Sequence, residues 1–297
     1  MTPAAPNAAT PQPMGRGLWS DALRRLRRNR PAMTSLLLLG LLVLAVTLGP
    51  VLSPNAFDRS DWDAILLPPT LAGGHWFGTD FLGRDLLVRT LHGGRISLLV
   101  GLSATLVSLA IGVVWGATAG YVGGRVDAFM MRVVDILYAL PFMFFVILLM
   151  VFFGRNIFLI FIALGAVEWL TMARIVRGQT LSVKRKEFIE AAHAGGVSNT
   201  KIIFRHIIPN VLGPVIVYMT LTIPQVILTE SFISFLGLGV QEPLTSLGNL
   251  ISNGARDMEI APWTLIFPAL TMMLTLFCFN FIGDGLRDAL DPKMKRS

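Results

Sequence analysis

The sequence predicts an all-α polytopic membrane protein with six transmembrane helices and both termini in the cytoplasm. Three observations predict this fold class. Of the 297 residues, 54% are hydrophobic and only 14% are charged, whereas a soluble domain usually carries about 25% charged residues. Long stretches of the chain contain no charge, and most lysines and arginines lie in alternate segments between those stretches.

Six stretches are long enough, or nearly so, to span a membrane, because a helix needs about 20 residues to cross a hydrocarbon core of about 30 Å. They cover 31–57, 96–124, 136–154, 157–173, 207–229 and 260–283. Only the fourth contains a charge, Glu168. Gly154, Arg155 and Asn156 alone separate the third stretch from the fourth, which predicts a helical hairpin. The first membrane helix is expected to cover 31–53.

The positions of the basic residues indicate how these spans are oriented. If the N-terminus is cytoplasmic, 19 of the 25 lysines and arginines lie on the cytoplasmic side and 6 on the outer side, as the positive-inside rule requires. Five or seven spans would place the basic C-terminal tail, 286–297, outside. The first apolar stretch exceeds the roughly 7–15 apolar residues of a cleaved signal peptide, so we expect it to be retained.

The N-terminal region before the first span has two parts. The first, 1–17, is rich in Ala, Pro, Asn, Thr and Gln and is expected to be disordered. In the second, 18–30, the residues Leu18, Ala22 and Leu26 recur at helical spacing among arginines. This pattern fits either a short amphipathic helix on an anionic membrane surface or a basic flank that only orients the first span.

The motifs of several enzyme and binding classes are absent from the sequence. Cys278 is the single cysteine, which excludes an internal disulfide and a thiolate zinc site. The sequence has no GxxxxGK[ST] loop, no HExxH and no nucleic-acid-binding motif, so we expect no cofactor in this chain and no nucleic-acid partner. Asp284, Asp288 and Asp291 share a helix face, but the basic residues beside them favour a solvated, salt-paired tail.

Small residues and prolines shape several spans. Gly112, Gly116 and Gly120 recur every four residues, which puts them on one helix face and lets another helix approach it closely. Prolines lie within or at the edge of four spans and can kink them. These prolines are Pro141, Pro214, Pro224 and Pro268.

Acidic residues inside a membrane are costly and are therefore candidates for function. Asp135 and Arg132 are three residues apart, so local pairing explains both. Glu230 lies near the outer end of the fifth span, where it could be solvated. Glu168 lies about 16 Å along its helix and either lines an aqueous path or pairs within a protein interface. Glu168 and Glu230 are the candidate path-lining residues.

The cytoplasmic loop at 184–210 predicts a short helix, a glycine turn and a second helix that re-enters the membrane. Acidic residues fall near the start of the first helix, alanines make it narrow, and glycines end it, while Ser198 or Asn199 can cap the next helix. A narrow helix projecting from the cytoplasmic face suits the docking of a partner. Its defining residues are Glu187, Glu190, Ala191, Ala192, Gly195 and Gly196.

This loop resembles the EAA loop of bacterial ATP-binding-cassette (ABC) importer permeases. That pattern has EAA, three residues, Gly, nine residues, Ile, one residue and Leu-Pro. The tripeptide at 190–192, Gly196 and Pro209 match its spacing. His206 stands where Ile is usual and Ile208 where Leu is usual, so the chain departs from the consensus at two positions.

Other segments are similar to signatures of the peptide-transport branch of that family. Together with 174–192, they resemble the C-type permease of oligopeptide importers over nearly the whole chain beyond residue 17. The resemblance implies the type I ABC importer permease fold, with a periplasmic loop at 54–95 and a five-helix transport core at 96–285. The further matching segments are 75–101, 120–142, 234–243 and 283–293.

The resemblance also implies partners and a mechanism. A homologous B-type permease would complete the translocation path in the bacterial cytoplasmic membrane. Two ATPase subunits would bind ATP and Mg²⁺ and act on the EAA loop, and a periplasmic or lipid-anchored peptide-binding protein would dock outside. The loop 54–95 and the segment 234–256 would form the docking and outer-gate surface. Related systems carry oligopeptides, dipeptides, a nickel complex or glutathione, and the sequence leaves the cargo open among these.

Two other functional classes compete with this one. A self-sufficient secondary transporter would need coupling-ion sites or inverted repeats, and only the intramembrane acids favour it. A membrane-bound lipid-modifying enzyme would need a catalytic cluster at one face, and only the acidic residues of 284–291 could serve. Peptide transport by the chain in vesicles without an ATPase partner would decide for the first alternative.

Overall fold

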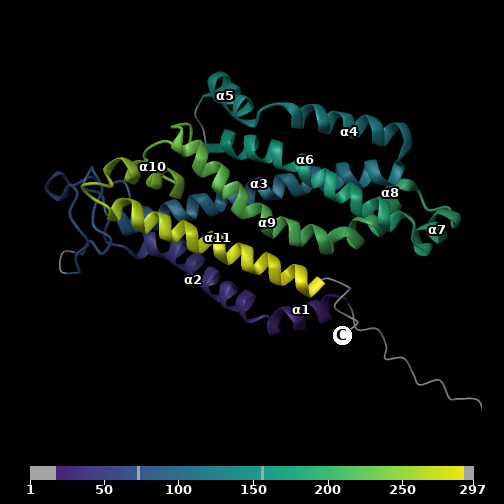
Figure 1. The fold of residues 1–297 in the computed structure, drawn as a ribbon, viewed down its shortest axis with the longest axis horizontal. Coiled ribbons are helices and arrows are strands. Elements are labelled where there is room, and N and C mark those ends of the chain that lie inside the picture. Colours follow the sequence, from purple (N-terminus) through teal and green to yellow (C-terminus); the bar gives the residue numbers. More distant parts are fainter. Residues whose placement is uncertain (1–17, 72–73, 155–156, 291–297) are drawn as a thin grey trace, which may run out of the picture.

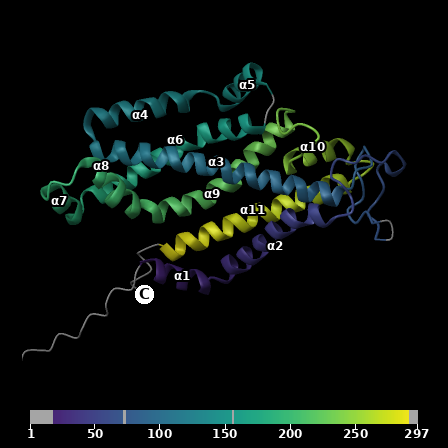
Figure 2. The same cartoon turned by 180° about the vertical axis from the view of Figure 1, so that it is seen from behind.

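The computed structural model describes residues 18–71, 74–154 and 157–290 (Figures 1 and 2). The expected disordered segment 1–17 and the last residues of the tail lie outside this part of the chain. The described residues are mostly helical and form no strand beyond one isolated bridge between Thr79 and Asp85. The all-α class that the apolar stretches predict is confirmed.

Eleven α-helices and two short helical turns make up the described chain. The turns are a 3₁₀ turn at Trp62–Ala64 and a π-helical turn at Ile203–Ile207. The α-helices are α1 (Leu18–Arg28), α2 (Arg30–Leu52), α3 (Leu86–Val122), α4 (Gly124–Ala139), α5 (Phe142–Phe153), α6 (Ile157–Lys184), α7 (Glu187–Ala194), α8 (Asn199–Ile202), α9 (Ile208–Phe235), α10 (Leu247–Asp257) and α11 (Trp263–Leu290).

Four helical stretches of the described chain are long and apolar enough to cross a membrane, and one bent pair could form a fifth span. The four are α2, α3, the continuous stretch from α8 through α9, and α11. The bent pair is α4 with α5. The sequence predicts six spans, and α6 is the helix that this count leaves out, although its 28 residues extend about 42 Å.

The helix α3 begins earlier than expected. The sequence places the start of the second span at 96, but the helix starts at Leu86, where the side chain of Asp85 accepts a hydrogen bond from the Val88 amide and caps the first turn. The last ten residues of the expected outer loop 54–95 are therefore helical. With 37 residues, α3 extends about 55 Å and reaches well beyond a bilayer core of about 30 Å.

The expected third span, 136–154, is two helices instead of one. The helix α4 ends at Ala139, and α5 starts at Phe142 with its axis turned by 79°. Pro141 explains the break, because it has no amide hydrogen for the helix ladder and disfavours helical backbone at the preceding Leu140, whose ψ is 130°.

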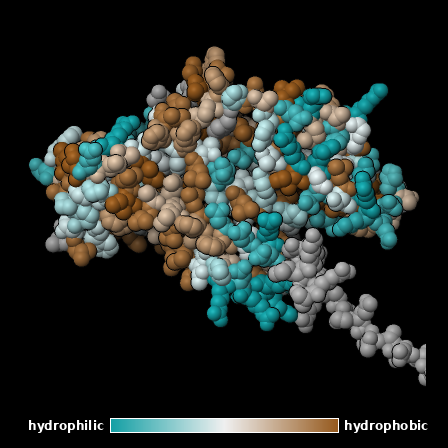
Figure 3. All heavy atoms as spheres, viewed as in Figure 1, coloured by the Kyte–Doolittle hydropathy of each residue, from teal (hydrophilic) through white to brown (hydrophobic). Residues whose placement is uncertain are grey.

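The helices are arranged in a flat bundle whose two ends differ. In both views α4 and α5 lie along one side, α1 and α2 along the other, and α3, α6, α9 and α11 between them (Figures 1 and 2). The loop after α2 and α10 lie at one end, whereas α1, α7 and the end of α11 lie toward the other (Figure 1). Hydrophobic side chains cover much of the middle of the face in Figure 3, and hydrophilic ones gather over α1 and the α7 end.

The amphipathic helix α1 buries part of its apolar stripe against the protein. Ala22 is buried, and Cδ1 of Leu26 lies 3.2 Å from the place that a Cβ on Gly285 of α11 would take. Leu23, by contrast, is exposed beside the arginines. The apolar stripe of α1 is thus at least partly occupied by α11, and its basic face is turned outward.

Candidate functional site

The helix α7 projects from one end of the bundle (Figure 1). Glu187 and Glu190 lie in its first turn, where carboxylates interact favourably with the positive end of the helix dipole. Both side chains are exposed, as is Ala191, whereas Ala192 is partly covered. The predicted coupling residues therefore present a small, acidic, narrow surface.

A glycine turn ends α7. The amide of Val197 donates to the carbonyl of Ala192 at 3.1 Å, and the amide of Gly196 donates to the carbonyl of His193 at 3.0 Å. This arrangement closes the helix and requires left-handed backbone at one residue. Gly196 has that conformation, with φ of 74°, and Gly195 precedes it with an ordinary negative φ.

The inner face of α7 is anchored in the bundle. Ile189 is buried in a hydrophobic cluster with Ile202, Ile203 and Val183, so the short helix is attached to both α6 and the start of the next span. The π-helical turn that follows α8 has a physical cause at Pro209. Proline has no amide hydrogen, and its ring collides with the carbonyl four residues earlier, so the turn before it widens.

The three predicted packing glycines lie where α3 contacts α6. A Cβ on Gly112 would lie 2.6 Å from Cβ of Met172, and one on Gly120 would lie 2.9 Å from Cβ of Thr180. A Cβ on Gly116 would collide with the backbone carbonyl of Ala173. The two backbones are in contact along this face, which only glycine permits.

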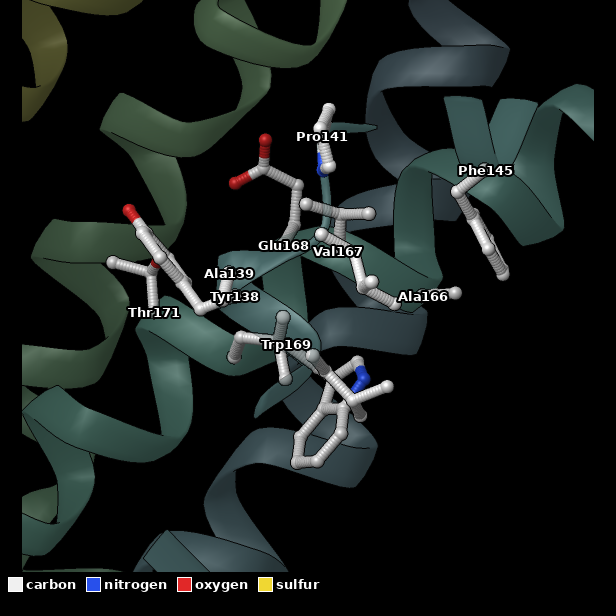
Figure 4. A pocket seen from close by; sticks show the side chains of 12 residues that line it. Tyr138, Ala139, Pro141, Phe145, Ala166, Val167, Glu168, Trp169 and Thr171 are labelled. Atoms are coloured by element: carbon white, nitrogen blue, oxygen red, sulfur yellow. The ribbon is translucent and has the colours of Figure 1, made fainter. Parts of the chain in front are cut away.

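Glu168 lies on the wall of a cavity of about 590 Å³ between α6 and the bend that joins α4 to α5. Tyr138, Pro141 and Phe145 line it from the α4–α5 side, and Thr171 follows Glu168 on α6. In Figure 4 the polar ends of Glu168, Tyr138 and Thr171 lie on one side of the view, and the indole ring of Trp169 lies on the other. The Glu168 side chain is half-buried and forms no ion pair within the described chain.

The placement of Glu230 differs from the expectation. The sequence suggests that it is solvated near the outer end of its span, but its side chain is fully buried. One carboxylate oxygen accepts a hydrogen bond of 2.6 Å from Ser234, and Ser97 and Ser246 surround the same group. Contacts from α3 and α10 thus enclose Glu230, and in this structure it lines no accessible path.

The acidic residues of α4 pair across helices. The local pair that the spacing predicts, Arg132 with Asp135, is wrong: Asp135 binds Arg174 of α6 at 2.8 Å. Eight residues earlier in α4, both oxygens of Asp127 accept hydrogen bonds of 2.6 Å from the guanidinium of Arg177. These two contacts connect α4 to α6.

An ionic network at the opposite end of the bundle, with buried arginines and a half-exposed Glu242, is missing from the sequence-based predictions. Arg84 binds Asp80 at 2.7 Å and Glu242 at 2.6 Å, and Arg89 binds Glu242 at 3.2 Å. Beside it, His75 binds Asp85 at 2.8 Å. The network joins the loop after α2 to the segment between α9 and α10.

Two features of the sequence could have indicated this network. Both outer segments carry charges next to apolar and aromatic residues, and the charges are complementary, with Arg84 and Arg89 in one segment and Glu242 in the other. Nothing in the spacing, however, indicates that residues more than 150 positions apart meet. The fold brings them together because α3 and α9 pack side by side and deliver both segments to the same end.

Comparisons with known proteins agree with this architecture. Residues 112–296 match the family model described as the binding-protein-dependent transport system inner membrane component. Residues 17–69 match the N-terminal TM domain of oligopeptide transport permease C. In solved structures, an inward-facing form of the MetNI methionine ABC transporter is similar in fold, with a TM-score of 0.56 and 18% identity over 69% of this chain and 96% of that chain.

Curated relatives extend the similarity over nearly the full chain. The oligopeptide transport system permease protein OppC of Escherichia coli K12 is 61% identical, and that of Haemophilus influenzae is 60% identical. Each alignment covers 94% of this chain and at least 90% of the relative. The dipeptide transport system permease protein DppC of Bacillus subtilis is 47% identical over 93% of this chain and 86% of its own length.

Proposed function

Because this chain belongs to the family of binding-protein-dependent transport system inner membrane components, we propose that it forms half of a translocation path for oligopeptides in an ATP-driven importer. One observation carries the cargo assignment: identity of 60–61% to oligopeptide permeases over 94% of the chain. The chain is a multi-pass protein of the inner membrane, as the family description and its apolar helices indicate.

The proposed complex contains a second, B-type permease, two ATPase subunits and a peptide-binding protein on the outer side. ATP and Mg²⁺ are bound by the ATPases, and this chain transmits the ATPase movement through α7. The geometry supports such a role for α7, because the helix projects from the bundle yet is anchored by Ile189. A push on α7 therefore moves the cytoplasmic ends of α6 and α9 together.

The proposed topology has six spans with both termini in the cytoplasm. The four candidate spans, the bent pair α4–α5 as one crossing, and α6 add up to this number. The end of the bundle that carries α7 also carries α1 and the end of α11 (Figure 1). Placing that end in the cytoplasm agrees with the distribution of lysine and arginine.

Replacement of Gly196 by valine tests the coupling role of α7. A β-branched side chain is strained at φ of 74°, so we expect the turn to rearrange and α7 to lose its orientation. The purified variant should retain less ATPase subunit than wild type, and peptide uptake by reconstituted vesicles should fall by about tenfold or more. Gly178→Ala on the exposed face of α6 is the matched control, because a Cβ there meets nothing within 4 Å.

Two results would contradict the proposal. Normal peptide uptake by vesicles that contain the Gly196→Val variant would contradict the coupling role of α7. Uptake by the wild-type chain in vesicles that contain neither ATPase nor a second permease would contradict the importer function itself and favour a self-sufficient transporter.

A dipeptide importer is the alternative within the same family. The 47% identity to a dipeptide permease supports it. Uptake of dipeptides and of penta-alanine, measured with the cognate binding protein, would separate the two cargoes.

A further inference from the structure

Among the residues that the structure describes, the carboxylate of Glu168 has no cationic partner. The nearest guanidinium groups along α6 are engaged elsewhere: Arg174 with Asp135 and Arg177 with Asp127. Arg174 also lies 4.4 Å above the centre of the Tyr138 ring, which fixes its position further. In the described chain Glu168 is therefore the one cavity-lining charge that no other residue balances.

The polar side chains that share the cavity wall with Glu168 are neutral. Tyr138 and Thr171 line the same cavity as Glu168, and Tyr218 of α9 lies nearby. Hydroxyl groups solvate a carboxylate but do not cancel its charge. A charged side chain in a membrane interior is costly unless it is paired or lies in a water-filled cavity, so the site favours a ligand that brings a positive charge.

A primary ammonium group fits this wall. It is compact and has three donors and no acceptor, which suits a carboxylate in a cavity that also carries the hydroxyls of Tyr138 and Thr171. Phe145 adds an aromatic face to the cavity wall, and such a face attracts a cation through the aromatic quadrupole. The rest of the lining is mainly apolar, including Ala166 and Val167, and does not select one peptide side chain over another.

We propose that the cavity at Glu168 binds the N-terminal ammonium of the peptide during its passage. This inference rests on the proposed function, because it takes the cargo to be a peptide. Each unmodified peptide carries this group whatever its sequence, so a carboxylate in an apolar cavity gives one common contact without selecting side chains. A cavity of about 590 Å³ holds the leading residues of a peptide and leaves the remainder free.

The test measures peptide binding to the complete complex without the binding protein, so that only the membrane subunits contribute. The two permeases and two ATPases are placed in lipid nanodiscs, and saturation-transfer NMR measures the affinity of trialanine, N-acetyl-trialanine and trialanine amide. We expect acetylation to weaken binding by about tenfold or more, because it removes the charge and a charge-assisted hydrogen bond. Amidation of the C-terminus should change the affinity by no more than about twofold relative to trialanine. In wild type, the methyl group of the N-terminal alanine should show the strongest saturation transfer.

Glu168→Gln identifies the residue responsible. The substitution should weaken the binding of trialanine by about tenfold and leave the affinity for N-acetyl-trialanine unchanged, so that both peptides bind with the same affinity. Glu259→Gln, at an exposed acidic residue of the outer end, is the matched control and should behave as wild type. Assembly of Glu168→Gln is checked by its recovery of both ATPases.

Several outcomes would overturn the inference. Equal affinity of wild type for trialanine and its acetylated form would show that the ammonium is not recognised, as would absence of any trialanine signal at 10 mM (about the weakest binding expected for a transport site). Because this comparison uses only the wild-type complex, a negative result could not be explained by misfolding of Glu168→Gln. If wild type still takes up peptide in an ATP-dependent way while these tests fail, the proposed function stands and only the ammonium site is lost.

Discussion

Arg89 is the most deeply buried residue of the ionic network that joins the loop after α2 to the segment between α9 and α10. Its guanidinium is fully buried and contacts Asp80, Glu242 and the carbonyl of Phe57. Removing one partner of a buried ion pair leaves the opposite charge uncompensated, which typically costs about 3–5 kcal/mol. Arg84 still balances part of the acidic charge here, so we expect Arg89→Leu to cost about 3 kcal/mol.

The stability of Arg89→Leu can be measured with the protein's own thiol. Cys278 is the single cysteine and is buried, so a thiol-reactive dye reports unfolding during a thermal scan. The midpoint should fall by several degrees relative to wild type, whereas Arg256→Leu, at an exposed arginine without an ion pair in the described chain, should leave it unchanged. Equal midpoints for both variants would mean that the network contributes little.

Glu230 shows why single residues are hard to place from sequence. Its position near the end of a span was correctly identified, since it lies five residues before the last residue of α9. Its environment depends on Ser97 of α3 and Ser246 at the start of α10. These residues are 133 positions before it and 16 after it, and periodicity within one helix carries no information about them.

At the scale of elements, the contact between α3 and α6 makes a prediction about Gly116. Even one added methyl would collide with the Ala173 carbonyl and lie 2.9 Å from Cβ of Val176. Overpacking of a filled interface costs about 1–3 kcal/mol, and here the obstacle is backbone, which cannot rotate away. Gly116→Ala should therefore lower the midpoint of the same thiol assay and reduce transport.

Gly40→Ala supplies the matched control for that prediction. Gly40 lies in α2, and a Cβ there meets nothing within 4 Å. Alanine is favoured over glycine inside a helix by up to about 1 kcal/mol, so this variant should be neutral or slightly stabilised. A loss of stability in Gly40→Ala as large as in Gly116→Ala would show that the effect comes from glycine flexibility rather than from close packing.

For helices α4 and α5, the sequence predicts the kink between them but not the contacts that hold α4 in place. The hydrophobic run and Pro141 both indicated a kinked span, and the kink is there. The sequence could not show that α4 is held by Arg174 and Arg177, because those arginines lie 39 and 50 residues beyond their partners. A local partner for Asp135 was available in Arg132, and the structure uses the distant one.

At the scale of the whole molecule, composition predicted the class because the membrane imposes it. Backbone groups inside a bilayer must be satisfied within the segment, so apolar stretches of this length are helices almost without alternative. Their borders follow from other forces, such as the cap at Asp85 that starts α3 ten residues before the apolar stretch. The sequence thus predicts the class of the fold better than it predicts where each helix begins.

Topology is the prediction that concerns the whole molecule, and single cysteines test it. In a Cys278→Ser background, cysteine replaces Ser60 after α2, Glu259 after α10 and Ala194 at the end of α7, all three exposed. An impermeant maleimide added to intact spheroplasts should label the Ser60 and Glu259 variants. It should label the Ala194 variant only after the membrane is permeabilised.

This pattern depends on whether the bent pair α4–α5 counts as one crossing. If the pair entered and left on the same side, α6 would carry the chain outward, and α7 would be labelled together with Ser60. The coupling helix would then face away from any ATPase, and the end of α11 would follow it outside. Protection of Ala194→Cys therefore supports six spans, the cytoplasmic C-terminus and the assigned role of α7 at once, whereas its labelling in intact spheroplasts would contradict all three.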